Sequence, residues 1–244
     1  MGEEPESSEV RESTEVEERR AGAGDPARAE GRDPARAQGR DPARQRPGEV
    51  VTEEGDEDAP ALDPEAEARR VAAMSFIRRL GDPVLKSSAT PVDRFDDSLR
   101  KQVSRMAGIM GDAFGVGLAA PQLGFSQRLL VYRMGPDAQL VALANPELEW
   151  SSRDQEVLYE GCLSIPGITV DVERPVHVRV RALDEEGETR MVEASGLEAR
   201  VIQHEMDHLD GVLILDRTSR DERKRALREL REAERAREER EQAA

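Results

Sequence analysis

A short segment near the end of the chain constrains its structure more than any other part. Residues 203–211 read QHEMDHLDG, which places His204 and His208 four residues apart with Glu205 beside the first. On an α-helix, residues four apart lie one turn apart on the same face, so both imidazoles can reach one metal ion. Glu205 would lie next to that ion, as a base for water that the metal activates. The segment therefore predicts a helix that carries a metal-dependent hydrolytic site.

The limits of this helix are also predicted. Residues 195–198 (SGLE) form a capping box, with the hydroxyl of Ser195 at the N-cap and the carboxylate of Glu198 at the third helical position. Gly211 follows the histidines, as is typical of a C-terminal cap. Apolar residues recur at helical spacing on the face of the histidines, so we expect both rings to point inward.

The first seventy or so residues differ from the rest in composition. They hold much of the acidic excess and almost no large apolar side chains, which is typical of a segment too polar to order itself. Asp-Pro-Ala-Arg recurs every eight residues from position 25, and its prolines prevent a continuous helix. We predict a disordered tail over 1–73, a catalytic domain over 74–216 and a charged helix or tail over 217–244. A competing hypothesis is that translation begins at Met74.

Charge, hydropathy and cysteine content exclude several classes of protein. The formal net charge of −16 argues against nucleic acid as a specific partner. No stretch approaches the ~18 apolar residues of a membrane span, and the Glu-rich tail lacks the apolar run of a secretory signal. A single cysteine excludes an internal disulfide framework and fits a reducing compartment. We therefore expect a cytoplasmic protein with no membrane partner.

Hydrophobic periodicity within 74–216 predicts an α+β domain with antiparallel sheet. An amphipathic helix is expected over 93–110, because Leu99, Val103, Met106 and Met110 recur at helical spacing. Strands are predicted where the sequence is rich in Val, Ile and Leu or alternates strictly, over residues 128–132, 139–143, 176–181 and 189–193. The last two of these strands are joined by a turn at 184–187.

The predicted metal site needs a third ligand, for which two residues compete. His177 alternates with valines in a predicted strand, so its ring should face solvent. Cys162 lies in the sequence EGCLSIP, a loop or strand end, although a lone cysteine is more often a small buried hydrophobe. One thiolate and two imidazoles leave a fourth tetrahedral position open, as catalytic sites require. This ligand set suits Fe(II), Zn, Co or Ni, and by itself does not choose among them.

Residues 115–122 (GVGLAAPQ) form a block of small side chains that would let a substrate backbone approach closely. The block lacks the third glycine of a dinucleotide fingerprint and the Lys-Ser/Thr of a phosphate loop, which argues against a nucleotide. Gln122 offers an amide that can donate a hydrogen bond to a developing oxyanion.

Three blocks, 115–122, 160–164 and 203–211, together resemble the signature motifs of the peptide deformylase family, in the family's order. The resemblance implies an α+β fold with antiparallel sheets around a central helix bearing the His-Glu-x-x-His motif. It implies that Cys162, His204 and His208 bind one metal ion, with ferrous iron as the native ion and zinc, nickel or cobalt as replacements.

The resemblance also implies a reaction and roles for further residues. The substrate is the N-formylmethionine end of a nascent chain, and the products are formate and a free amino terminus. Glu205 would pass a proton from the attacking water to the leaving amine, and Gln122 with the backbone N–H of Leu163 would stabilise the oxyanion. Gly117 would let the formyl group approach the metal.

Recognition of the substrate and of partners is the remaining part of the hypothesis. We expect Val116 and Ile165 to form walls of the methionine pocket, whereas Leu118 fits a wall or the core equally well. The segment 217–244 fits an exposed helix, and in some related enzymes such a segment resembles a ribosome-docking helix. Its charges are nearly balanced, so we expect only modest electrostatic attraction to ribosomal RNA.

Two alternative functions share some of these features. A zincin-like metalloprotease also carries His-Glu-x-x-His, but it takes its third ligand from a later residue, and no histidine follows His208. A catalytically inactive interaction protein on the same fold would usually have lost a ligand or the base, and this chain retains all of them.

Overall fold

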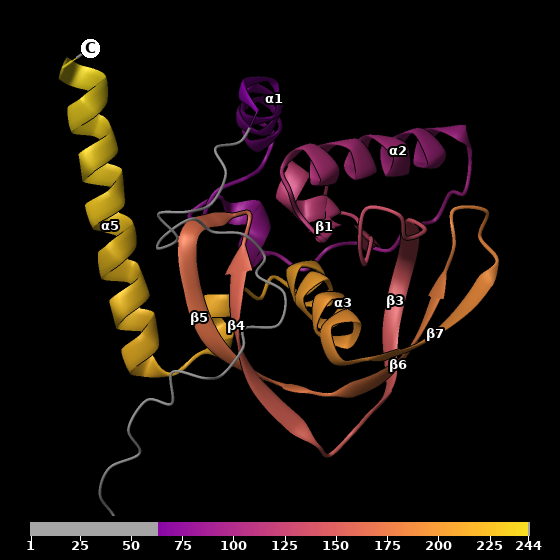
Figure 1. Ribbon diagram of the computed structural model, residues 1–244. Coiled ribbons are helices and arrows are strands. Elements are labelled where there is room, and N and C mark those ends of the chain that lie inside the picture. Colours follow the sequence, from indigo (N-terminus) through magenta and orange to yellow (C-terminus); the bar gives the residue numbers. More distant parts are fainter. Residues whose placement is uncertain (1–62, 244) are drawn as a thin grey trace, which may run out of the picture. The chain divides into compact units, whose positions relative to one another are not determined.

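The computed structural model of the protein describes residues 63–243 (Figure 1). The Asp-Pro-Ala-Arg repeats and most of the predicted tail therefore lie outside the described residues. The helices are α1 Pro64–Met74, α2 Asp97–Asp112, α3 Gly196–Leu209, α4 Ile214–Arg217 and α5 Arg220–Ala243. The strands are β1 Gly117–Ala119, β2 Leu129–Tyr132, β3 Val141–Ser151, β4 Gln155–Cys162, β5 Ile165–Pro175, β6 His177–Leu183 and β7 Thr189–Ser195.

The strands form two antiparallel sheets, which confirms the predicted α+β class. The larger sheet has the order β1-β2-β3-β6-β7, and the smaller sheet is the hairpin β4-β5. The hairpin is inserted in the chain between β3 and β6, which are themselves neighbours in the larger sheet. Helix α3 packs against strands of both sheets, and Figure 1 shows it between the hairpin and the strands β6 and β7.

The buried face of α3 anchors this helix in the core. Ile202 and Leu209 are fully buried in a cluster with Leu130 and Val180 of the larger sheet. The amphipathic helix predicted over 93–110 is α2, and its predicted apolar stripe is buried, because Leu99, Val103, Met106 and Met110 all face the core.

The predicted capping box at the start of α3 is wrong. Ser195 is the N-cap residue but makes no side-chain cap, because its hydroxyl lies 2.8 Å from Nδ1 of His177 on the neighbouring strand. Glu198 instead accepts a hydrogen bond of 2.9 Å from the hydroxyl of Tyr132. Tertiary partners have replaced the local ones.

The predicted C-terminal cap is confirmed. Gly211 has φ +70°, the left-handed conformation that glycine adopts without strain. It also lies against the backbone of a 3-10 turn, Pro83–Lys86: a Cβ at position 211 would be 2.8 Å from the carbonyl carbon of Lys86 and 3.0 Å from the nitrogen of Ser87. The end of α3 is therefore packed where no side chain fits.

Four predicted strands correspond to β2, β3, β6 and β7, but the β4-β5 hairpin was not predicted. Its buried positions include Glu160 and Arg174, so hydrophobic alternation is broken on the inward face. Pro166 and Gly167 near the start of β5 also resemble a loop in sequence.

Both ends of the described chain are helical. Helix α1 begins at Pro64, inside the segment predicted as a tail, and it packs on α2 with Ala73 buried. Helix α5 packs along β5, where Ala226 is buried and Arg225 donates a 3.0 Å hydrogen bond to the carbonyl of Thr169. Within residues 63–243, every helix is too short or too polar to cross a lipid bilayer.

Candidate metal centre

The three residues predicted as metal ligands converge in the fold. Cys162 ends strand β4, and His204 and His208 lie on successive turns of α3. One potential ligand atom from each lies within 4.8 Å of the other two, and Sγ of Cys162 is 3.3 Å from Nε2 of His208. Ligand atoms of one tetrahedral ion are about 3.5 Å apart, given metal–sulfur and metal–nitrogen bonds of ~2.3 and ~2.0 Å. The arrangement fits a single cation.

Glu160 fixes the orientation of His204. Its Oε2 lies 3.0 Å from Nδ1 of the ring, which leaves Nε2 for a metal, as in most metal-binding histidines. Burial alone would raise the pKa of Glu160, but hydrogen bonds from Arg174 and His204 hold that pKa well below its usual range. Glu160 is therefore a carboxylate that accepts the imidazole N–H.

The chemistry of the donor set also fits a metal ion. Burial opposes ionisation of the Cys162 thiol, yet the neighbouring His208 and His204 hold its pKa well below the usual value. A thiolate is the form of cysteine that binds metals. Oε2 of Glu205 is a buried polar atom at this centre and has no hydrogen-bond partner among the residues described. Such atoms are rare in the absence of a water or ion.

Glu205 occupies the place expected of a catalytic base. It lies one residue after His204 on α3, its side chain is buried, and burial raises the pKa of its carboxyl. A carboxylate with a raised pKa exchanges protons more readily near neutral pH.

Gly117 makes room for this carboxylate. A Cβ at position 117 would lie 2.5 Å from Oε1 of Glu205 and 2.8 Å from its Cγ, closer than real Cβ atoms approach. The sequence suggested that Gly117 admits a substrate. In the structure, the space beside its Cα is filled by Glu205.

We expect Gly117→Ala to displace the Glu205 carboxylate and to lower kcat by about 10²-fold, because a shift near 1 Å in a catalytic group costs roughly that much. Metal content should be unchanged, since the three atoms nearest to this Cβ all belong to Glu205 and none belongs to a candidate ligand. Steady-state kinetics would be compared with Gly108→Ala, an exposed α2 glycine where an added Cβ meets nothing within 4 Å. Equal kcat in both variants would contradict this role.

Gln122, the predicted oxyanion donor, lies close to Cys162. It is buried in the 3-10 turn Ala120–Leu123, and its Oε1 accepts a 2.9 Å hydrogen bond from the backbone N–H of Ala119. This bond fixes which way the amide points, so that Nε2 is 3.3 Å from Oγ of Ser164 and 3.8 Å from Sγ of Cys162. The amide donor is thus directed at the metal ligands.

A cavity opens beside these residues, and it defines which predicted pocket residues face the site. Val116, Gly117 and Leu163 line it, whereas Ile165 does not. Ile165 is fully buried in an apolar cluster that includes Cys162 and Leu213, so the structure does not place it at a wall of this cavity. Leu118 is also fully buried in the core. The cavity is also lined by four residues that no motif in the sequence singles out: Leu158, Tyr159, Leu197 and Val201.

His177 lies away from the centre, as expected. Its side chain is exposed on β6 and its Nδ1 contacts Ser195. Three converging candidate ligands with a buried carboxylate beside them are typical of the class of metal-dependent hydrolases.

Comparison with known proteins identifies the family within that class. The family model of polypeptide deformylase matches residues 74–224. A peptide deformylase of Natranaerobius thermophilus is 47% identical over 145 residues, which cover 59% of this chain and 92% of the relative. One from Parafrankia sp. is 45% identical over 152 residues, covering 62% and 82%.

Solved structures of peptide deformylases are similar to this chain in fold as well as in sequence. The crystal structure of peptide deformylase from Thermotoga maritima superposes with a TM-score of 0.57 at 48% identity, covering 59% of this chain and 96% of that one. The enzyme from Synechococcus elongatus, in complex with actinonin, gives a TM-score of 0.61 at 46% identity, covering 63% and 85%. This chain belongs to the peptide deformylase family. It is a metal-dependent hydrolase that removes the formyl group from the amino terminus of nascent polypeptides.

Proposed function

We propose that deformylation takes place at the centre formed by Cys162, His204, His208 and Glu205, with the first three as ligands of a divalent ion. The convergence of the three ligand atoms within 4.8 Å carries this proposal. When bound, the ion polarises the formyl carbonyl and lowers the pKa of water. The chain's own residues position the substrate and move the proton.

Glu205 accepts a proton from the attacking water at its buried carboxylate. The water oxygen bonds to the formyl carbon, the C–N bond breaks, and Glu205 returns the proton to the departing amine nitrogen, giving formate and a free amino terminus. The amide of Gln122 and the backbone N–H of Leu163 donate to the oxyanion that forms between these steps. The methionine side chain lies among the apolar residues of the cavity, with Val116 as one wall.

A direct test compares two substrates of equal length. Purified protein should release formate from a formyl-Met tripeptide and should leave the internal bonds of an acetylated peptide of the same sequence uncut. Cleavage of an internal bond at a comparable rate would favour the zincin-like alternative, and no formate release by the metal-loaded protein would overturn the proposal.

We expect Gln122→Ala to lower kcat by about 10²–10³-fold, the usual cost of removing one oxyanion donor. The substitution also removes the acceptor of the Ala119 N–H, so thermal stability must be measured in parallel with kinetics. Gln139→Ala, an exposed glutamine, is the matched control. A loss confined to KM or to stability would contradict the oxyanion role of Gln122.

Ferrous iron is the ion that we propose for the native centre, with zinc, nickel and cobalt as replacements. The thiolate and two imidazoles accept all four metals, and the choice of iron follows from the resemblance to the family. Elemental analysis of protein purified without oxygen, paired with activity, tests it: zinc at full occupancy in the most active fraction would overturn the assignment.

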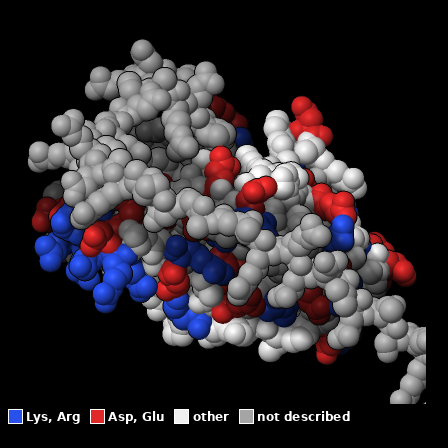
Figure 2. All heavy atoms as spheres, turned by 90° about the horizontal axis from the view of Figure 1, so that it is seen from below, with Lys and Arg blue, Asp and Glu red and all other residues white. Residues whose placement is uncertain are grey.

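We further propose that the C-terminal segment docks the enzyme on the ribosome, in the cytoplasm where nascent chains emerge. The charge of this segment is unevenly placed: six basic and two acidic residues lie between 217 and 228, whereas acidic residues predominate beyond. Figure 2 shows Lys and Arg side chains gathered at the left edge of the face in view, the side on which Figure 1 draws α5. Such a cluster suits the phosphates of ribosomal RNA.

Charge reversal tests docking better than truncation, because Ala226 and its neighbours are part of the core. We expect Arg220→Glu with Lys224→Glu to abolish salt-sensitive co-sedimentation with ribosomes while hydrolysis of a formyl-Met tripeptide is unchanged. Arg235→Glu with Arg240→Glu, in the acidic half of α5, is the matched control. Undiminished co-sedimentation of the first variant would remove this part of the proposal.

A further inference from the structure

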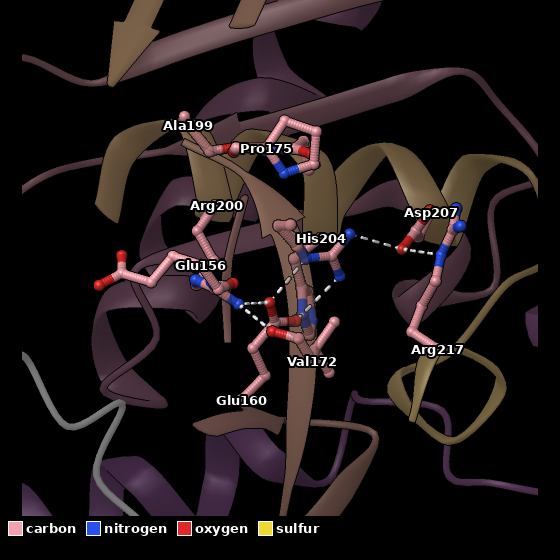
Figure 3. A network of polar contacts seen from close by, with 11 residues as sticks. Glu156, Glu160, Val172, Pro175, Ala199, Arg200, His204, Asp207 and Arg217 are labelled. Atoms are coloured by element: carbon pink, nitrogen blue, oxygen red, sulfur yellow. Dashed lines mark hydrogen bonds and ion pairs between the residues drawn. The ribbon is translucent and has the colours of Figure 1, made fainter. Parts of the chain in front are cut away.

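A chain of buried charges lies next to the candidate metal centre. Glu160, Arg174 and Asp207 are each less than one-tenth exposed. Figure 3 shows Glu160 close to His204 and Arg200, with Asp207 and Arg217 to one side. Buried charges are costly unless they are fully paired, so this arrangement must be closely matched.

Arg174 joins the two carboxylates with one guanidinium. Its Nε and Nη2 donate to the two oxygens of Glu160 at 2.6 and 2.9 Å, and its Nη1 donates to Oδ2 of Asp207 at 2.9 Å. A planar, rigid fork of this kind fixes the positions of both partners relative to each other, which the flexible ammonium of a lysine cannot do.

Glu160 contacts one of the two histidines directly, whereas Asp207 is the neighbour in the chain of the other. Glu160 lies 3.0 Å from Nδ1 of His204, so it sets the direction in which that ring points. Asp207 immediately precedes His208 on α3, and Arg217 grips its carboxylate from the other side through Nε at 3.0 Å and Nη2 at 2.5 Å. The position of Asp207 therefore sets the last turn of α3, which carries His208.

We propose that Arg174 is a positioning residue of the metal centre, which holds the ring of His204 and the turn of α3 that carries His208 in place relative to the hairpin that carries Cys162. This rests on the proposed function, in which both histidines are ligands. Arg174 is not among the residues that line the cavity, and its hydrogen bonds go to Glu160 and Asp207 and not to the candidate ligands. It acts through Glu160 on one histidine and through Asp207 on the other.

Arg200 provides a matched comparison. Arg200 is also buried and donates to Oε1 of Glu160 at 2.7 Å, the oxygen that accepts from Nε of Arg174. Its other hydrogen bonds go to the backbone carbonyls of Val172 and Glu156. Loss of Arg200 leaves Glu160 with both bonds from Arg174, and it leaves Asp207 untouched. Of these two arginines, only Arg174 links the two carboxylates.

The test uses the full chain with Arg174→Lys, Arg174→Gln, Arg200→Lys and Arg200→Gln. The dissociation constant for Co²⁺ is measured by competition with a chelator, together with the visible absorption of the bound cobalt and the melting temperature of the metal-free protein. We expect all four variants to melt earlier. Only the Arg174 pair should weaken Co²⁺ binding by about 10–100-fold, the usual effect of losing support behind a ligand, and alter the cobalt spectrum.

A purely structural role would lower melting temperature while leaving cobalt affinity and spectrum as in the wild type, and that result would overturn the proposal. So would equal losses of affinity in the Arg174 and Arg200 variants. If Arg174→Gln does not fold, Arg174→Lys and Asp207→Asn probe the same link, and normal cobalt binding by both is decisive against it. Failure of the wild type to bind Co²⁺ would instead refute the proposed ligands.

Discussion

Glu205→Gln should turn over formyl-Met peptides at least about 10⁴-fold more slowly than the wild type, at the upper end of what general acid–base catalysis contributes. Glutamine has the shape of glutamate, so it fills the same buried space beside Gly117. It cannot accept and return a proton. Since Glu205 is not among the three converging ligands, the variant should keep one metal ion per chain.

Two measurements check this expectation: formate release under saturating substrate, and metal content by elemental analysis. Glu198→Gln, on the same helix but hydrogen-bonded to Tyr132, is the control and should remain active. If Glu205→Gln kept more than about one-tenth of wild-type kcat, proton transfer in the transition state would have to belong to another group. If it lost its metal, Glu205 would be part of the coordination site.

Cys162→Ser should abolish metal binding and, with it, activity. Serine is nearly isosteric, but its hydroxyl stays protonated where the Cys162 thiol ionises, so the anionic ligand is lost. Two imidazoles then remain. We expect the loss of affinity to exceed the about 10–100-fold that accompanies loss of a supporting hydrogen bond, because a ligand itself is removed.

Metal binding by Cys162→Ser would be titrated against a chelator, with folding checked by circular dichroism. His177→Ala removes an exposed histidine outside the centre and should bind metal normally, which controls for any effect of purification. A Cys162→Ser protein that held one ion with wild-type affinity would show that the coordination uses another third ligand.

A site residue could be predicted when its partners are close to it in sequence or when its own motif is distinctive. His204 and His208 are four residues apart on one helix, so their convergence is a local property of the sequence. Cys162 is distant in sequence, but it is the only cysteine and its flanking motif is distinctive. Arg174 had neither advantage: it is one of many arginines in the chain, and its importance comes from two carboxylates far from it in sequence.

The fold shows the same division. Helix α2 and strands such as β6 alternate or repeat their apolar residues clearly and were predicted. The β4-β5 hairpin supplies Cys162 and one wall of the cavity, yet its inward face carries Glu160 and Arg174, which compensate each other only after folding. Ile165 was misplaced for a related reason, since its orientation depends on the register of that hairpin.

Gly211, which follows the end of α3, helps to fix the position of the two histidines along the axis of this helix. A helix can in principle slide along its own axis by exchanging one set of neighbours for the next. Here the backbone of Lys86 and Ser87 lies so close to Gly211 that a residue with a Cβ would clash at this position. Moving α3 by one position would bring Asp210 or Val212 to that wall. Because Gly211 fits only at this point, the position of His208, three residues earlier, is fixed relative to the 3-10 turn.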